Sequence, residues 1–175
     1  AQIITGGYSS FGVVTGNTVN ANGSNISGRI IGGESFSNDA SNNHVHFKDS
    51  SATSVYGGYS NGGNVSDNTV AVDGSSMIHS VLFGGYSNTG DATGNTAIIN
   101  GGSVASASGG YSDSGNASYN TVMMNGGSVM GTLHGGVSDS GHAMNNVVNI
   151  NGGAAMPSTI NPNIPGGLEQ IIMHA

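Results

Sequence analysis

The sequence predicts an all-β fold in which successive turns of the chain stack in parallel, a single-stranded β-helix (β-solenoid). A Gly-Gly pair recurs with its first glycine at positions 6, 32, 57, 84, 109 and 135, so the steps are 26, 25, 27, 25 and 26 residues. Eleven residues after each first glycine stands an asparagine: Asn17, Asn43, Asn68, Asn95, Asn120 and Asn146. Such a regular repeat is typical of solenoids, in which each unit buries its apolar face only against its neighbours. We therefore expect one domain over residues 1–175, with six full coils of about 25–27 residues.

Apolar residues recur at fixed offsets from the first glycine and predict three short strands in each coil. The residue two positions before that glycine is apolar in all six repeats: Ile4, Ile30, Val55, Leu82, Ala107 and Leu133. Apolar residues also stand thirteen positions after it: Val19, Val45, Val70, Ala97, Val122 and Val148. Side chains alternate between the two faces of a strand, so the recurrent asparagines should point to the same side as this second set.

Glycine-containing turns are expected to separate these strands. The Gly-Gly pairs permit positive φ, and pairs such as Asp73-Gly74 and Asn100-Gly101 are strong turn signals. One strand would then enter the Gly-Gly pair, one would follow the asparagine, and one would resume after the Asn-Gly turn. No stretch combines a helical period with capping residues, so we expect no helix.

The recurrent asparagines favour one of two all-β arrangements. Asn-Gly between alternating apolar runs also signals β-hairpins, which would build an antiparallel prism or propeller. A buried side-chain amide is unfavourable unless it is hydrogen-bonded, and a hairpin offers each asparagine no partner of its own kind. In a parallel solenoid the coils lie about 4.8 Å apart, so each amide can donate to the amide oxygen of a neighbouring coil. The sequence therefore favours parallel stacking with a structural ladder of six asparagines.

The two ends of the chain differ from the regular repeat. We expect regular coils over residues 1–156, a proline-containing insertion over 157–165, and a final apolar strand over 166–175. A β-helix exposes unpaired N–H and C=O groups at each end, and such edges bind further strands. The final strand is therefore a candidate for end-to-end contact with another copy, and its candidate contact residues are Leu168, Ile171 and Ile172.

The composition excludes several classes of function. The formal net charge is −7 and the permanent cations are Arg29 and Lys48, so the chain cannot form the basic surface that nucleic-acid binding requires. No apolar run approaches the ~20 residues of a membrane helix, so we expect no membrane insertion of this segment. Cysteine is absent, which excludes disulfides and thiolate metal sites.

A column of tyrosines is the most prominent candidate contact surface. Stacked coils would align the residues two positions after the first glycine, which are Tyr8, Tyr59, Tyr86 and Tyr111 in four of the six coils. Such a column could bind sugar faces or a partner protein, or its rings could simply stack on one another and stiffen a corner of the coil. Glu34 and Val137 interrupt the column.

Histidine and aspartate positions suggest metal binding, and each has a simpler alternative. His44 and His46 lie two residues apart on one expected strand and could both ligate a metal, but no third ligand is assignable. Stacked carboxylates could hold calcium, although ordinary turn residues explain the same positions. These carboxylates form two pairs at equivalent offsets, Asp113 with Asp139 and Asp39 with Asp91. We expect no cofactor, with calcium as the alternative.

The sequence offers little material for catalysis. Many β-helices are polysaccharide lyases or hydrolases, which need clustered carboxylates or a basic residue that abstracts a proton. The two permanent cations, Arg29 and Lys48, both lie near the amino-terminal end, and no nucleophile or phosphate-loop motif is present. We therefore expect no catalytic residues.

The repeat resembles a known family. The consensus apolar-x-Gly-Gly-Tyr-Ser-x-x-Gly-x-Ala-x-x-Asn-Thr-Val, followed by Asn-Gly-Gly-Ser-Val, is similar to the repeats in passenger regions of bacterial autotransporter adhesins, which are exported by type V secretion. The resemblance covers residues 6–153 and is clearest over 84–104 and 109–129. It implies a right-handed parallel β-helix on the outer surface of a Gram-negative cell, used in adhesion or as a stalk. It also implies that the chain is a fragment or a released piece of a longer protein.

We therefore expect a non-enzymatic structural rod, extracellular or on the cell surface, whose partners are host or bacterial surface proteins or glycans. The alternative is a self-assembling extracellular fibre or matrix subunit, whose partners are other copies of itself joined end to end through open β-helix edges. A polysaccharide lyase or hydrolase is the least expected function.

Overall fold

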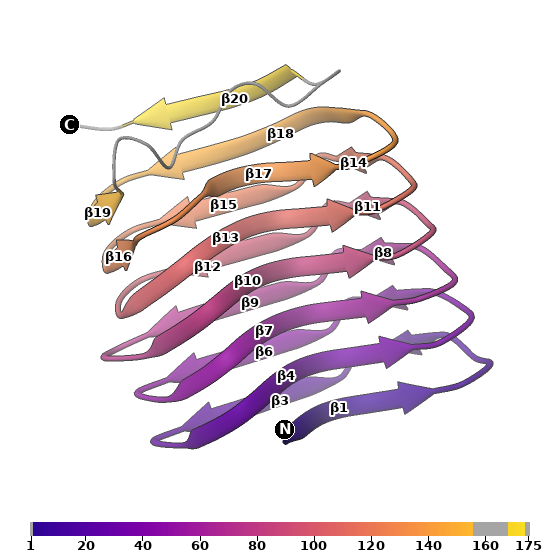
Figure 1. The fold of residues 1–175 in the computed structure, drawn as a ribbon, viewed down its shortest axis with the longest axis horizontal. Coiled ribbons are helices and arrows are strands. Elements are labelled where there is room, and N and C mark those ends of the chain that lie inside the picture. Colours follow the sequence, from indigo (N-terminus) through magenta and orange to yellow (C-terminus); the bar gives the residue numbers. More distant parts are fainter. Residues whose placement is uncertain (1, 156–167, 174–175) are drawn as a thin grey trace.

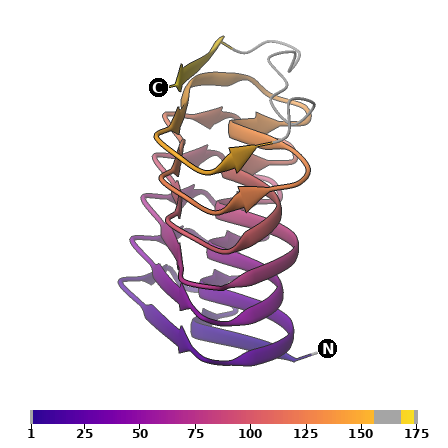
Figure 2. The same cartoon turned by 90° about the vertical axis from the view of Figure 1, so that its left-hand side faces the viewer.

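The computed structural model of the chain describes residues 2–155 and 168–173 and shows a right-handed parallel β-solenoid (Figure 1). The chain winds through six coils, and every strand pairing in the described residues is parallel. The expected fold class is therefore confirmed, and the hairpin alternative is wrong. Seen from the side, the coils stack into a regular rod (Figure 2).

One wall of the rod is a parallel sheet of eight strands, here called sheet A. Its strands are β1 (Ile3–Ser9), β4 (Asn25–Ser35), β7 (Ser51–Ser60), β10 (Met77–Ser87), β13 (Ser103–Ser112), β16 (Ser128–Val129), β17 (Leu133–Ser138) and β19 (Ala154–Ala155). Equivalent residues of adjacent coils are register partners, for example Gly58 with Gly85 and Tyr59 with Tyr86.

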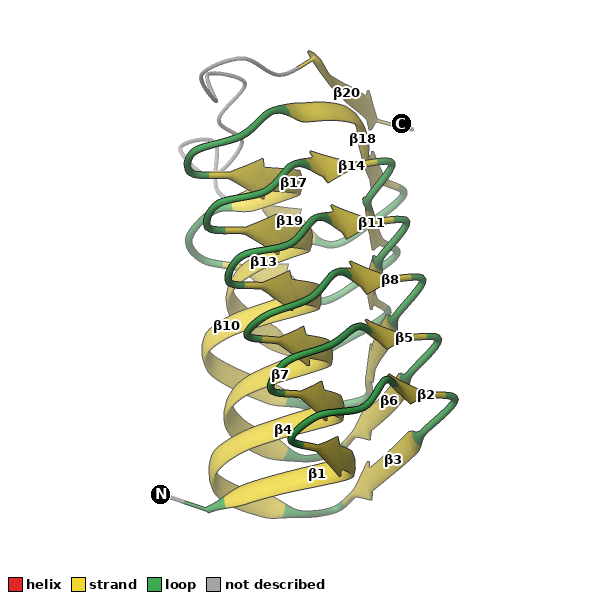
Figure 3. Ribbon diagram, turned by 90° about the vertical axis from the view of Figure 1, so that its right-hand side faces the viewer, coloured by secondary structure: helices red, strands yellow, loops and turns green. Residues whose placement is uncertain are grey.

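The opposite wall is a bent sheet of twelve strands, here called sheet B, to which each of the first five coils contributes a two-residue strand and a longer one (Figure 3). The two-residue strands are β2 (Val14–Thr15), β5 (Ala40–Ser41), β8 (Val65–Ser66), β11 (Ala92–Thr93) and β14 (Ala117–Ser118). The longer strands are β3 (Thr18–Asn22), β6 (His44–Lys48), β9 (Thr69–Asp73), β12 (Thr96–Ile99), β15 (Thr121–Met124), β18 (Ala143–Ile150) and β20 (Leu168–Met173).

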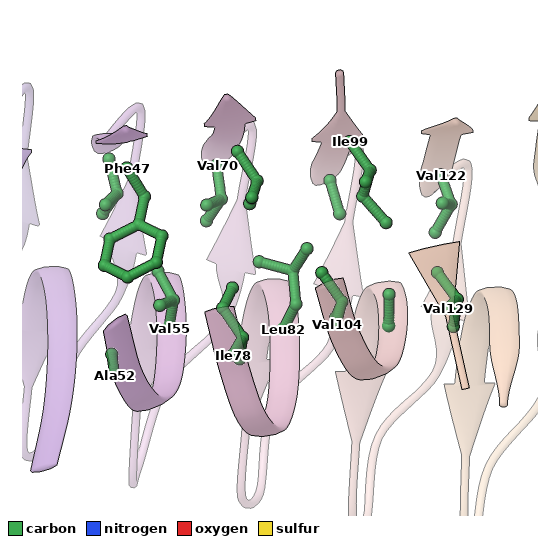
Figure 4. Close-up of a cluster of buried hydrophobic side chains, with 14 of the residues drawn as sticks. Phe47, Ala52, Val55, Val70, Ile78, Leu82, Ile99, Val104, Val122 and Val129 are labelled. Atoms are coloured by element: carbon green, nitrogen blue, oxygen red, sulfur yellow. The ribbon is translucent and has the colours of Figure 1, made fainter. Parts of the chain in front are cut away.

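The apolar side chains of the two sheets meet in a continuous core along the rod (Figure 4). Leu82 from sheet A and Ile99 from sheet B are both fully buried, as expected from their offsets in the repeat. The large side chains Phe47 and Met124 fill the same interior in the second and fifth coils. Since each coil packs only on its neighbours, the core is a stack of thin layers rather than one globular centre.

The Gly-Gly pairs lie inside strands, which corrects the expectation that they form turns. None of the six pairs has positive φ, and the strand expected to enter each pair continues through it. In β4, β7, β10 and β13 the strand after the Asn-Gly turn and the strand entering the next Gly-Gly pair are one continuous element. A register irregularity, such as that between Ile78 and Val81, bends the strand partway along.

The real turn lies immediately before each ladder asparagine. The residue there has positive φ in all six coils: Gly16, Asn42, Asp67, Gly94, Tyr119 and Asn145. In the first five coils this turn separates the two-residue strand from the longer strand of sheet B, whereas in the sixth coil both parts belong to β18. The two-residue strands, which we did not expect, and the start of β18 contribute one further buried column of small apolar residues: Val14, Ala40, Val65, Ala92, Ala117 and Ala143.

The strand expected at the end of the chain is present as β20, which pairs in parallel with β18. Register places Glu169 beside Asn146 and Ile171 beside Val148, so β20 continues sheet B by one further strand. Figure 1 shows β20 at the opposite end of the rod from the amino terminus. The proline-containing insertion expected at 157–165 lies outside the described residues.

Candidate functional site

The six predicted asparagines form a ladder along the inside of the rod. Asn68 Nδ2 donates to Asn95 Oδ1 at 2.9 Å, and Asn95 Nδ2 donates to Asn120 Oδ1 at 3.0 Å. Equivalent bonds of 2.9–3.1 Å join the other adjacent pairs from Asn17 to Asn146. The last five asparagines are buried, so the prediction that the amides share the core side of the strand is confirmed.

Every hydrogen-bonding atom of an internal ladder amide is used. In Asn95, Oδ1 accepts from the backbone N–H and from Nδ2 of Asn68, at 3.1 and 2.9 Å. The second Nδ2 hydrogen donates to the carbonyl of Val65 at 2.9 Å, which lies one coil back. A polar column is tolerated inside the apolar core because every polar atom of these amides is hydrogen-bonded.

The second glycine of each pair makes room for the ladder. A Cβ added at Gly110 would lie 2.3 Å from Cγ of Asn120, and one at Gly58 would lie 2.5 Å from Cγ of Asn68. Any side chain would therefore collide with the amide. The Gly-Gly pair and the asparagine eleven residues later are parts of one structural unit.

A serine column, which the sequence analysis did not single out, forms a second polar ladder. Ser87 Oγ donates to the carbonyl of Gly63 in the preceding coil at 2.7 Å and accepts the N–H of Gly90 at 2.9 Å. Ser35, Ser60, Ser112 and Ser138 make the same two bonds in their coils. The signal was present in the sequence, because a serine follows each Gly-Gly pair after one residue.

The tyrosine column on the outside of sheet A is continuous over three coils. Tyr59 and Tyr86 stack with ring centroids 5.3 Å apart and an interplanar angle of 4°, and Tyr86 and Tyr111 stack at 5.4 Å and 13°. Tyr8 is separated from them by Glu34, and Tyr8 is 62% exposed. Because the stacked rings cover one another's faces, they offer a partner mainly their edges and hydroxyl groups.

Two more aromatic residues, which the sequence analysis missed, pack beside this column: Tyr56, which is buried, and Phe83, which is half-buried. Tyr56 packs edge-on against Tyr59 with ring centroids 6.1 Å apart. The ring centroid of Phe83 lies 5.8 Å from that of Tyr86 and 5.2 Å from that of Tyr111. Tyr56 and Tyr59 are three residues apart, so simple alternation along a strand would not bring them together. The Gly-Gly pair between them breaks the alternation and places both rings on the outer face.

Carboxylates of the next coil bind two of the tyrosine hydroxyls. Tyr86 OH donates to Asp113 Oδ2 at 2.7 Å, and Tyr111 OH donates to Asp139 Oδ2 at 2.8 Å. Burial is the larger cause and these hydrogen bonds the next that raise the pKa of both phenols. The carboxylates of Asp113 and Asp139, which were candidates for holding calcium, thus each accept a hydrogen bond from a tyrosine.

The second aspartate pair, Asp39 and Asp91, does not form a stack of its own because Asn64 lies between them. Asp39 Oδ1 accepts the backbone N–H of Asn64 at 2.8 Å, and Asp91 Oδ1 accepts that of Asn116 at 2.7 Å. Both carboxylates therefore hold one coil on the next.

His44 and His46 are exposed on β6, on the outer side of sheet B. In the part of the chain that the structure describes, no group of three or more His, Cys, Asp or Glu side chains could hold a metal ion.

The first coil differs from the others in its exposed side chains. Phe11 is 84% exposed and Val13 is 56% exposed, whereas the later coils carry polar residues or glycine at both positions. Ile3, at 52%, also lies open to solvent in this coil. Three apolar side chains of the first coil are therefore exposed to solvent.

Comparison of the chain with protein-family models, with curated proteins and with solved structures gives no match. Within residues 2–155 and 168–173 there is no helix with the length and hydrophobicity of a membrane span.

Proposed function

We propose that the protein is a non-enzymatic structural rod, displayed on the surface of a Gram-negative bacterium or outside the cell, that serves in adhesion or as a stalk. The observation that supports this proposal best is the uninterrupted ladder from Asn17 to Asn146. A ladder that repeats the same bonds in every coil gives a rod of uniform cross-section, and such a rod holds whatever it carries at a fixed distance. The resemblance of the repeats to autotransporter passenger regions supports the location.

Within this proposal, the aromatic surface of Tyr59, Phe83, Tyr86 and Tyr111 is the place we assign to contact with a surface protein or glycan. Ring edges and phenol groups on rigid strands combine apolar area with hydrogen-bonding capacity, a combination enriched in interfaces. Asp113 and Asp139 fix the orientation of two of these phenols before any partner arrives. A preorganised surface loses less entropy on binding.

The candidate carboxylates support a non-catalytic role. Asp113 and Asp139 bind tyrosine hydroxyls, and Asp39 and Asp91 bind backbone N–H groups of the following coils. Each therefore has a structural task in the stack. A head-to-tail fibre is the alternative function, and the parallel, in-register pairing of adjacent coils favours it, because the same pairing can join one copy to the next.

The test is binding of the labelled full chain to immobilised glycans, extracellular-matrix proteins and whole bacterial cells. Adhesion predicts saturable binding that falls at least tenfold in a Tyr59→Ser, Tyr86→Ser, Tyr111→Ser variant, while a His44→Ser, His46→Ser variant on the opposite sheet binds normally. A pure stalk predicts no saturable binding to any surface. Release of reducing sugars or unsaturated products from polysaccharides, with or without calcium, would contradict the proposal.

A further inference from the structure

Asparagine followed by glycine recurs at the ends of strands and in the turns after them. The five pairs begin at Asn22, Asn61, Asn100, Asn125 and Asn151. Asparagine is a thermolabile residue, and glycine has no side chain to hinder attack by its own backbone nitrogen on the asparagine before it. These pairs are therefore the places where the chain can modify itself.

The chemistry needs only water. The glycine nitrogen forms a bond to Cγ of the asparagine, the bond between Cγ and Nδ2 breaks, and ammonia leaves with the proton that the glycine nitrogen gives up. Water then opens the resulting five-membered ring. Depending on which ring bond water breaks, the product is aspartate or isoaspartate, in which the backbone runs through the side chain.

Asn100 and Asn125 form a matched pair of such sites. Both precede Gly-Gly-Ser, and both side chains are exposed. They belong to an outer column of amides, in which Asn125 Nδ2 donates to Asn100 Oδ1 at 2.8 Å and Asn151 Nδ2 donates to Asn125 Oδ1 at 2.8 Å. Asn100 Nδ2 donates to Asp73 Oδ1, also at 2.8 Å. Each of the two amides thus has the same sequence context and uses both its oxygen and its nitrogen.

The two sites differ in the N–H of the glycine that follows. Gly126 N–H donates to the carbonyl of Ile99 in the preceding coil at 3.2 Å. The corresponding carbonyl for Gly101 is that of Val72, which accepts the N–H of Asn100 at 2.9 Å. Gly101 N–H donates to none of the described residues. The nitrogen that must attack is therefore hydrogen-bonded at one site and open to water at the other.

Turn lengths explain this difference. Four residues, 73–76, join the paired strands in the third coil, whereas three residues, 100–102, join them in the fourth. Three residues, 125–127, also join them in the fifth. The turn that contains Asn125 consequently follows a turn of its own length, and its glycine meets the carbonyl of the preceding coil. The turn that contains Asn100 follows a longer one and does not match it.

We propose that Asn100 is a modification site, at which the folded chain converts asparagine to aspartate or isoaspartate, while stacking protects Asn125. A hydrogen-bonded N–H must be released before its nitrogen can react. One backbone bond at an exposed turn slows such a reaction by roughly two- to tenfold.

The same criterion sorts the other three Asn-Gly pairs. Gly62 N–H donates to none of the described residues, so Asn61 is a second position where conversion is expected. Gly23 N–H donates to a carbonyl at 3.1 Å and Gly152 N–H to one at 3.2 Å, so the asparagines before them are protected.

Conversion at position 100 changes the outer surface of the rod and leaves its interior intact. The product has no side-chain N–H, so the bond to Asp73 is lost and two carboxylates meet in adjacent coils. This adds one negative charge at the turn before β13, whereas Tyr111 lies near the other end of that strand. The inference goes beyond the proposed function and does not depend on it, because the aromatic surface takes no part.

The test is incubation of the folded full chain in neutral buffer, with chymotryptic digestion and mass spectrometry at intervals. Cleavage after Tyr111 and Tyr119 separates Asn100 from Asn125. Conversion at Asn100 should be roughly two- to tenfold faster than at Asn125. In the chain unfolded by guanidinium chloride the two rates should be equal, because the two sequence contexts are the same. Amide hydrogen exchange should also be faster at Gly101 than at Gly126.

Two variants identify the product. Asn100→Gln should remove the early acidic species from ion-exchange chromatography, and the matched Asn125→Gln should leave it. Equal rates at the two positions in the folded chain, or a faster rate at Asn125, would overturn the proposal. A difference that persists in the unfolded chain would also overturn it, because the cause would then not be the fold. Conversion at Asn100 with none at Asn61 would contradict the hydrogen-bond criterion.

Discussion

The side-chain amide of Asn68 donates to Oδ1 of Asn95 at 2.9 Å, and both side chains are completely buried. This bond joins two coils through groups that no water can reach. Replacing Asn95 by alanine leaves two N–H donors of Asn68 and the carbonyl of Val65 without their partners. We expect a loss of about 1–3 kcal/mol in the free energy of unfolding, measured by urea titration. Asn125→Ala, in the exposed asparagine pair with Asn100, is the matched control and should change stability by less than about 0.5 kcal/mol. Equal effects at the two sites would show that the buried ladder has no special role.

Gly110→Ala tests the contact between the Gly-Gly pair and the ladder. The added methyl would lie 2.3 Å from Cγ of Asn120, so the amide must move and its bonds must lengthen. Overpacking of this kind costs about 1–3 kcal/mol. Gly12→Ala is the control, since the nearest atom to its added Cβ is Ser9 Oγ at 3.1 Å and its φ is not positive. A neutral Gly110→Ala would contradict the explanation of why the repeat needs glycine there.

Tyr119→Gly should stabilise the protein. Tyr119 has φ of 56°, a left-handed conformation that is unfavourable for a residue with a Cβ, and its ring is 63% exposed. In the first and fourth coils, glycine occupies the equivalent position. We expect a gain of about 0.5–1 kcal/mol in urea titration. Tyr119→Ala keeps the Cβ and should show no gain, so a gain for alanine equal to that for glycine would rule out backbone strain as the cause.

Stability should fall in alkaline solution because the pKa values of Tyr86 and Tyr111 are raised in the folded state by burial and by hydrogen bonds to Asp113 and Asp139. The unfolded phenols ionise near about pH 10, whereas the folded ones keep their protons at that pH. Their stabilising contribution is thus complete below about pH 10 and decreases as the pH rises further. The check is the urea midpoint of unfolding from neutral to alkaline pH. A Tyr86→Phe, Tyr111→Phe variant should lose less stability over the alkaline range, and an unchanged slope would contradict the assignment.

Removal of one whole coil should be tolerated. Deleting residues 84–108 joins Phe83 to Gly109, so Tyr59 then precedes Tyr111 and Asn68 precedes Asn120 in the same columns. Each coil contacts only its neighbours, so the shorter rod should keep its β-sheet circular dichroism and unfold cooperatively. Deleting residues 84–95 alone removes about half a coil, shifts the columns against one another and should prevent folding. Loss of folding in the whole-coil variant would show that the coils are not equivalent units.

The sequence predicted those features that repeat in every coil at one position. The ladder asparagines and the column that contains Val70 and Val148 could be placed inside the rod because period-two alternation links them along one strand. The serine column, with Ser87, was equally regular and could have been found, since buried serines in stacked coils have neighbouring carbonyls to bond. The two-residue strands were missed because a strand as short as Val65–Ser66 shows no alternation.

The role of the Gly-Gly pairs could not be predicted from local sequence preferences. Glycine at turns is a local property, whereas Gly110 is required by the side chain of Asn120, which lies ten residues later, between β14 and β15 on the opposite wall. The joint surface of Tyr56 and Tyr59 was hidden for the same reason, because the glycines between them change which side chains face outward.

Cysteine pairs give the most direct test of parallel stacking in register, because the chain has no cysteine of its own. Thr69 and Thr96 are register partners in adjacent coils, while Thr121 lies one coil further along the same column. Adjacent positions should be about 4.8 Å apart, within the span of a disulfide, and positions two coils apart about twice that distance, beyond it. The account predicts that a Thr69→Cys, Thr96→Cys variant forms an intramolecular disulfide under mild oxidation and that a Thr69→Cys, Thr121→Cys variant does not. A disulfide in the second variant and none in the first would contradict the stacked-coil structure.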